Sequence, residues 1–173
     1  MSPSAQVDEA ARAAAEGTRC VALRARRLSR LVTRLFEQAL REHRITVAQF
    51  TLIGATILEG PLRPARLARL LDLEKSTLSR NLRLLEATGL LRVEGTAEGA
   101  GQLVHATGRG KRTLVRALPA WRAAQQRAIE ALGGVVVERL DSMIAALGGE
   151  RLASRRPRHR GAMGRHRRPS LVG

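Results

Sequence analysis

Residues 74–95, EKSTLSRNLRLLEATGLLRVEG, constrain the fold more than any other stretch of this chain. At roughly 100° per residue, Leu78, Leu82 and Leu85 share one side of a helix that runs from about residue 74 to residue 88. Gly89 is typical of a helix stop, because it adopts a left-handed conformation without strain. The opposite side of the helix carries short donors and guanidinium groups, from Ser76, Arg80 and Arg83, flanked by Thr77 and Ser79.

The neighbouring segments predict a short helix before this one and a hairpin after it. Pro64 suits the first turn of a helix over residues 64–71. The turn Asp72-Leu73-Glu74 follows, and we expect its carboxylates to cap the next helix. Two short apolar runs, Leu90–Glu94 and Gln102–Ala106, flank the glycine-rich EGTAEGAG and predict a two-stranded hairpin. This order is that of a helix-turn-helix followed by a wing.

The outer face of the second helix suits the major groove of DNA. Arginine can bind guanine O6 and N7 as a fork, whereas serine and threonine reach phosphates or base edges. The alternative is an ordinary solvated helix face, which the complete order of helices and hairpin disfavours. The residues predicted to read the groove are Ser76, Thr77, Ser79, Arg80 and Arg83, and the candidates for backbone contacts are Lys75, Asn81 and Arg92.

Longer helices are predicted on both sides of this unit. Leucines recur at helical spacing over Cys20–His43, and Thr46 looks like the N-cap of a helix that Gly60-Pro61 ends. A helix over Gly108–Leu132 should be kinked by Pro119, and a last one follows over Val135–Leu147. The fold class is mainly α with a small β-hairpin wing. The expected regions are a flexible N-terminus (1–17), helical dimerisation regions (18–45 and 108–148), a winged helix-turn-helix (46–107) and a disordered basic tail (149–173).

The composition is strongly basic and poor in aromatic residues. The 173 residues carry a formal net charge of +16, and aromatic residues make up only 2%. A strongly basic chain favours a polyanionic partner, most often nucleic acid. The competing explanation is compositional bias, because lysine occurs only at Lys75 and Lys111 and every other basic residue is arginine. The tail from residue 150 holds eight arginines, so it is either a solvated extension or a non-specific phosphate binder.

The sequence resembles the MarR family of winged-helix transcription regulators over about Cys20–Leu147. The resemblance is carried by ITVAQFTLIGATILEG, by RPARLARLLDLEKSTLSRNLRLLEATGLLRVE, and by ATGRGKRTL, in which Ala106 replaces the family's leucine while Thr107 and Gly110 remain. It implies a homodimer on a pseudo-palindromic operator of double-stranded DNA. It also implies dimerisation through the first and last helices, where apolar residues lack a core: Leu28, Leu31, Leu35, Val135, Leu140 and Ile144.

The resemblance further implies a repressor that is released by a small aromatic or phenolic effector. A second hypothesis is a non-specific DNA-coating or protein-interaction module driven by the basic tail. The wing departs from the family, because its tip, Thr96–Gly101, has Glu98 in place of an aspartate and no arginine after it. Direct contact of the wing tip with the minor groove is therefore not expected.

Cys20 is a redox candidate, because a peroxide-sensing branch of the family has a reactive cysteine in a similar Cys-x-x-Leu context. A helix N-terminus with Arg19 and Arg24 nearby is typical of the electropositive surroundings of reactive cysteines. That branch also uses tyrosines, and this chain has none, so a small hydrophobe is the alternative.

Other chemistry has little support in the sequence. The four histidines are scattered, which predicts no metal site and no cofactor, and no catalytic motif is present. Trp121 is expected in packing rather than in a ligand box. The opening MSPSAQVDEA has no signal-peptide pattern and no run reaches the length of a membrane span, so a cytoplasmic, nucleoid-associated protein is expected.

Overall fold

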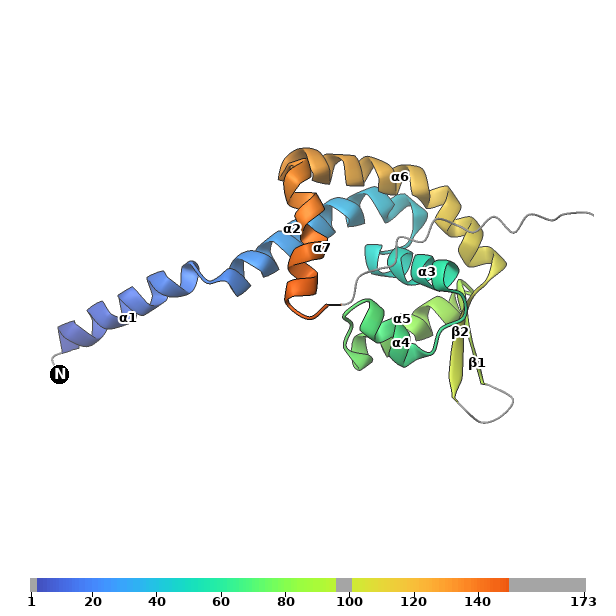
Figure 1. The fold of residues 1–173 in the computed structure, drawn as a ribbon, viewed down its shortest axis with the longest axis horizontal. Helices are drawn as coiled ribbons and strands as arrows, with labels where there is room; N and C mark the ends of the chain where they lie inside the picture. Colours follow the sequence, from blue (N-terminus) through green and yellow to red (C-terminus); the bar gives the residue numbers. More distant parts are fainter. Residues whose placement is uncertain (1–2, 96–100, 150–173) are drawn as a thin grey trace, which may run out of the picture.

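The computed structural model describes residues 3–95 and 101–149, which form a mainly helical chain with one small hairpin (Figure 1). The elements in chain order are α1 (Pro3–Thr18), α2 (Val21–Leu40), the 3₁₀ turn η1 (Arg41–His43), α3 (Val47–Glu59), α4 (Pro64–Leu70), α5 (Lys75–Ala87), β1 (Leu91–Gly95), β2 (Gln102–Ala106), α6 (Gly108–Leu132) and α7 (Gly134–Ala146). The predicted fold class is confirmed, because the hairpin directly follows α4 and α5 and the long helices enclose this unit in the sequence.

Local signals set most of the helix boundaries. Thr46 forms a complete capping box with Gln49, since its hydroxyl accepts from Gln49 N at 3.1 Å and Gln49 Oε1 accepts from Thr46 N at 3.0 Å. Gly89 has a φ of +67°, as the predicted stop of the preceding helix requires. Gly133, with a φ of +82°, separates α6 from α7. These residues explain why helix bounds read from the sequence agree with the structure to within a few residues.

The predicted capping at the start of α5 is wrong. Glu74 occupies the N-cap position, but its side chain makes no capping hydrogen bond. The turn before α5 instead depends on backbone geometry, because Asp72 adopts a left-handed φ of +48° and Leu73 N bonds to Ala68 O at 2.9 Å. The helix predicted over Cys20–His43 also differs, since its last turn tightens into η1.

The main core lies under the helix-turn-helix and the hairpin. Fully buried leucines of α3, α4 and α5 meet apolar residues of both strands there: Leu52, Leu67, Leu85, Leu91 and Val104. A second, smaller cluster joins Phe36 of α2 to Ala124 and Ala128 of α6. Trp121 packs against both clusters, stacking on Phe50 at a centroid distance of 5.7 Å and lying 5.9 Å from Phe36. The expectation that Trp121 serves packing is confirmed.

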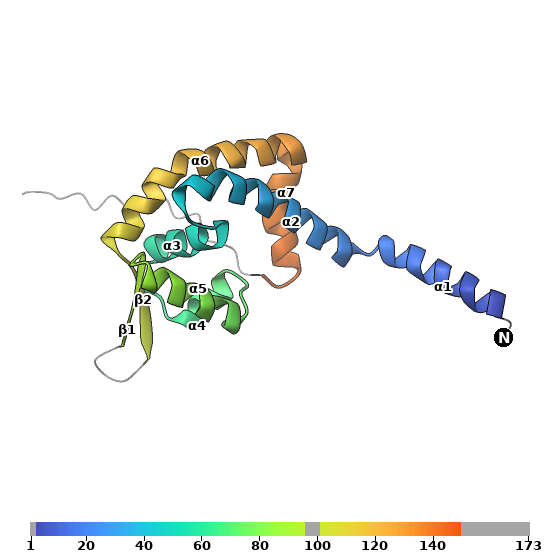
Figure 2. The same ribbon diagram turned by 180° about the vertical axis from the view of Figure 1, so that it is seen from behind.

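The outer helices leave apolar side chains uncovered. α7 buries none of its residues, and Ile144, Met143 and Val135 stay exposed on it. Leu31 of α2 is 55% exposed. A flexible N-terminus was predicted over residues 1–17, whereas Pro3–Thr18 form the helix α1, which Figure 2 shows extending away from the rest of the chain. Helix α6 runs unbroken through Pro119 and bends over its length (Figure 1).

Candidate nucleic-acid interface

Helices α4 and α5 are joined by a tight turn and held by leucines. Leu67 and Leu70 of α4 are buried together with Leu78, Leu82 and Leu85 of α5. Because Leu78, Leu82 and Leu85 recur at helical spacing, their burial fixes which side of α5 faces away from the protein. The structure therefore confirms the leucine-faced helix that the sequence predicts.

The opposite side of α5 is open to solvent. Most of the predicted groove-reading and backbone-contact residues of α5 are exposed there: Lys75, Ser76, Thr77, Arg80 and Arg83. Ser79 and Asn81 are only half-buried at the flanks of this face. Five of the seven predicted side chains on α5 can thus approach a flat or convex partner without any movement of the backbone.

Two hydrogen bonds already occupy polar groups on this face. Arg83 Nη2 donates to Ser79 Oγ at 3.2 Å, and Asn81 Nδ2 donates to Thr77 O at 3.0 Å. Both join residues four apart on one helix turn, so they orient the donors along α5. Arg80 has no such partner among the described residues, which leaves its guanidinium fork available for a base edge.

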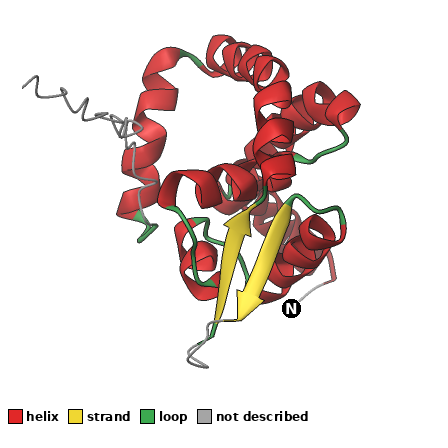
Figure 3. Cartoon of the chain, turned by 90° about the vertical axis from the view of Figure 1, so that its right-hand side faces the viewer, coloured by secondary structure: helices red, strands yellow, loops and turns green. Residues whose placement is uncertain are grey.

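The hairpin consists of two antiparallel strands (Figure 3). Its register places Leu91 opposite Ala106 and Gly95 opposite Gln102. A bridge extends it, because Leu62 and Val104 exchange both backbone hydrogen bonds, at 3.2 and 2.8 Å. The last strand is thus paired on both sides near its middle. The predicted tip residues 96–100 lie outside the described residues.

Arg92 lies at the base of the hairpin, where a backbone contact was predicted, but it is already paired. Its Nε is 2.8 Å from Glu94 Oε1, and His105 Nε2 is 3.3 Å from Glu94 Oε2. The Arg92 side chain remains 63% exposed. A phosphate would compete with Glu94 for Arg92, and an exposed pair of this kind contributes little to stability.

Thr107 and Gly110 hold the hairpin and α6 to the end of α5, a role that sequence reasoning missed. Thr107 Oγ1 donates to Gly89 O at 2.7 Å, lies 3.1 Å from Leu90 O, and accepts from Gly110 N at 3.0 Å. A Cβ at Gly110 would overlap the carbonyl oxygen of Leu90. The Thr-x-x-Gly pattern in the sequence could have indicated this role. The pattern is needed because the two backbones approach each other closely here.

A cleft of about 740 Å³ separates α5 from the hairpin and α4. Lys75, Ser79 and Arg83 line it from α5, and Gln102 lines it from β2. The sequence did not predict Gln102 as part of this surface, because no motif in the surrounding residues indicates such a role. The cleft brings polar side chains of the helix and of the hairpin to one surface.

Cys20 stands apart from this surface. It is an exposed free cysteine at the N-cap of α2, between α1 and α2, and it makes no side-chain capping bond. Its predicted redox role and the alternative of a small hydrophobic residue both stay predictions. No group of three His, Cys, Asp or Glu side chains in the described ranges could hold a metal ion. None of the described helices is both long and apolar enough to cross a membrane.

Comparisons with known proteins agree with this geometry. Residues 45–100 match the model of the MarR family. The chain is similar in structure to the Mycobacterium tuberculosis transcriptional regulator MosR, with 29% identity over 75% of this chain and 93% of that one and a TM-score of 0.65. It is similar to MosR in complex with DNA (27% identity, 75% and 96% covered, TM-score 0.67).

The fold is also that of Escherichia coli MarR in its apo form, at 19% identity, with 74% and 96% of the two chains covered and a TM-score of 0.59. No curated protein matches the chain. The comparisons and the described architecture point the same way, to a winged helix-turn-helix carried by long helices.

Proposed function

The chain is a member of the MarR family by its matched segment and its fold, and on that premise we propose that it is a dimeric, operator-specific transcription regulator, acting as a repressor. The observation that carries the proposal is the exposed polar face of α5. Leu78, Leu82 and Leu85 of α5 are buried, and Arg80 has no partner among the described residues. MosR, with 27% identity, has been solved in complex with DNA, which supports DNA as the ligand of the same unit here.

Each predicted contact has a role in the proposal. Arg80 and Arg83 read guanines in the major groove, with Ser76, Thr77 and Ser79 beside them. Lys75, Asn81 and Arg92 bind phosphates, which positions the helix without reading sequence. On DNA binding, Arg83 breaks its hydrogen bond to Ser79 and binds a base edge. Arg92 likewise breaks its ion pair with Glu94 and binds a phosphate.

Dimerisation follows from uncovered apolar surface on the outer helices. Leu31 of α2 and Ile144 of α7 are large, exposed hydrophobic residues on the outer helices. A two-fold partner would bury these faces, and would place two copies of α5 about one turn of DNA apart, roughly 34 Å. Two-fold symmetry of the protein then requires a two-fold symmetric operator.

Control by a small neutral aromatic or phenolic molecule belongs to the same proposal. A hollow of about 420 Å³ lies between α2, α3, α4 and α7. A ligand that changed the packing of these helices would change the distance between the two DNA-binding units of the dimer. Glu37, Asp72 and Asp141 line the hollow, and no basic side chain does. Carboxylates repel anions, so a neutral phenol fits better than an aromatic acid. Thermal shift with phenol beside benzoate measures this preference.

DNA selection from a random pool tests the function. The full chain, the Arg80→Ala variant and a chain ending at residue 149 are compared at near-physiological salt. We expect the full chain and the truncated chain to recover one two-fold symmetric motif, and Arg80→Ala to lose it. The coating hypothesis predicts the reverse, with no motif and with binding that disappears together with the basic tail.

A further inference from the structure

The solvent face of α6 carries a stripe of positive charge that the proposed function does not use. Between Gly108 and Ile129 the helix has six basic residues and no acidic one. At roughly 100° per residue they fall within one arc of the helix, opposite the buried Gly110, Thr113, Ala117 and Ala124. The stripe consists of Arg109, Lys111, Arg112, Arg116, Arg122 and Arg127, all exposed.

Charge at this place is unfavourable for the helix itself. The N-terminus of a helix is the positive end of its dipole, where carboxylates stabilise and cations destabilise. α6 begins with Arg109 and Lys111 in its first turn and has no acidic residue there. None of the six side chains forms an ion pair with a carboxylate of the described ranges. The cations of the first turn therefore cost folding energy, and an external anion would offset this cost.

The beginning of the stripe forms a small hollow with an apolar floor. Lys111, Arg112 and Arg116 line it together with Val115, which is 67% exposed, and its volume is about 320 Å³. A sugar-phosphate backbone offers both features that this surface needs: an anionic oxygen for each cation and an apolar sugar face for the valine.

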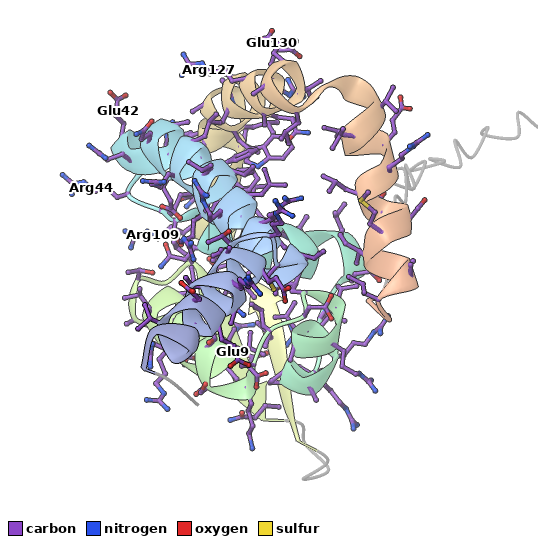
Figure 4. All side chains as sticks on the ribbon, turned by 90° about the vertical axis from the view of Figure 1, so that its left-hand side faces the viewer. Glu9, Glu42, Arg44, Arg109, Arg127 and Glu130 are labelled. Carbon is purple, nitrogen blue, oxygen red and sulfur yellow. The ribbon has the colours of Figure 1, made fainter. Side chains whose placement is uncertain are left out.

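The stripe starts at the same edge of the molecule as the hairpin. β2 ends at Ala106 and α6 begins at Gly108, so the first cation, Arg109, lies three residues beyond the wing. A Cβ at Gly89, directly after α5, would be 3.9 Å from Arg109 Cδ. Figure 1 shows α6 rising from the hairpin's edge, and in Figure 4 the Arg109 and Arg127 side chains, near the two ends of the stripe, project outward.

We propose that Lys111, Arg112 and Arg116, with Arg109, bind the phosphates of duplex DNA that flanks the operator, where it bends past the outer side of the wing. The inference rests on the proposed function, because operator binding brings the flanking duplex to this edge. The proposal also agrees with the wing tip, which lacks the arginine that the family carries there. The cations of α6 would then supply the contact with the DNA outside the half-site. The contacts are to backbone only, so they add affinity and salt dependence but no sequence preference.

The experiment compares two lengths of one duplex. The probe is the symmetric duplex recovered by selection, once ending at the outer edges of its half-sites and once extended by about 10 base pairs, one helical turn, on each side. Fluorescence anisotropy gives the dissociation constant between about 50 and 200 mM salt. The variant Lys111→Gln/Arg112→Gln/Arg116→Gln is measured beside the wild type. The matched control, Arg12→Gln/Arg19→Gln/Arg24→Gln, removes the same charge near α1, at the opposite side of the molecule.

The wild type should bind the long duplex more tightly, with a log–log salt slope steeper by up to about 7, from up to eight extra contacts in a dimer at roughly 0.9 each. The α6 variant, which retains Arg109, should lose about three quarters of this increment and keep its affinity for the short duplex, while the control variant keeps both. Circular dichroism melting checks that both variants are folded.

Other results overturn the inference in distinguishable ways. If the wild type binds both duplexes equally, or if the α6 variant keeps the increment, the stripe does not bind flanking DNA while the proposed function stands. If the α6 variant instead changes the oligomeric state, the basic stripe contacts the acidic helix α1 of another copy rather than DNA. If the wild type binds neither duplex, the proposed function fails together with the inference.

Discussion

Replacement of Gly110 by alanine tests the junction that holds the DNA-binding unit to α6. A Cβ there would overlap the carbonyl oxygen of Leu90 and lie 3.1 Å from its carbonyl carbon and 3.5 Å from its Cα. These atoms belong to backbone, and Leu90 is itself buried, so no side-chain rotation can relieve the overlap. In the variant, either α6 or the turn after α5 must move. This movement would strain the hydrogen bonds that Thr107 makes across the junction.

The magnitude follows from two opposing terms. Alanine is favoured over glycine inside a helix by about 1 kcal/mol. Overpacking in a well-packed region costs about 1–3 kcal/mol, occasionally more, and strained hydrogen bonds add to it. We expect a net loss of about 1–3 kcal/mol in the free energy of unfolding. For a chain of this size, that loss lowers the melting temperature by roughly 3–10 °C.

Gly108→Ala is the matched control, because it adds the same methyl group two residues earlier in α6. Its Cβ would meet only the tip of a flexible side chain, Arg112 Nη1, at 3.4 Å. Thermal unfolding followed by circular dichroism should show Gly110→Ala melting well below the wild type and Gly108→Ala melting at or slightly above it. If Gly110→Ala melts as high as the Gly108→Ala variant, the close approach to Leu90 is not a real constraint and the reasoning is refuted.

Arg80→Ala should lower affinity for the selected operator by about 1–3 kcal/mol, roughly 5- to 150-fold, and relax base preference at one position, as repeated DNA selection would show. Arg92→Ala should weaken all sequences equally and reduce the salt slope by about 1; a change in the motif would contradict its assignment to a phosphate. Thr107→Val should cost about 1–2 kcal/mol in urea unfolding, because Gly110 N and Gly89 O lose their partner; an unchanged midpoint would mean that water replaces the hydroxyl. Leu31→Glu should convert a dimer into a monomer by light scattering, and a persistent dimer would place the interface elsewhere.

Most of the elements were predictable from the sequence because their determinants are local. The spacing of Leu78, Leu82 and Leu85 defines one buried face of α5 without knowledge of what covers it. Thr46 and Gly89 begin and end helices through bonds and dihedral angles within a few residues. The exposed face of α5, and with it most of the candidate site, follows from the same periodicity.

The remaining features could not be read from helical periodicity, because they depend on backbone geometry in turns and strands or on contacts between segments that are distant in the chain. Glu74 was a reasonable capping residue by type, yet the turn before α5 is closed by backbone bonds instead. The pairing of Arg92 with Glu94 required the hairpin to form, and the cleft with Gln102 required the hairpin to lie beside α5.

The sequence by itself determined where helices start, stop and turn their apolar faces, since those depend on neighbours three or four residues away. The tertiary structure alone decided that Gly110 must pass the backbone of Leu90, twenty residues earlier, and that the cations of α6 stand at the edge of the hairpin. Such approaches are set by the packing of the whole core, and periodicity carries no information about them.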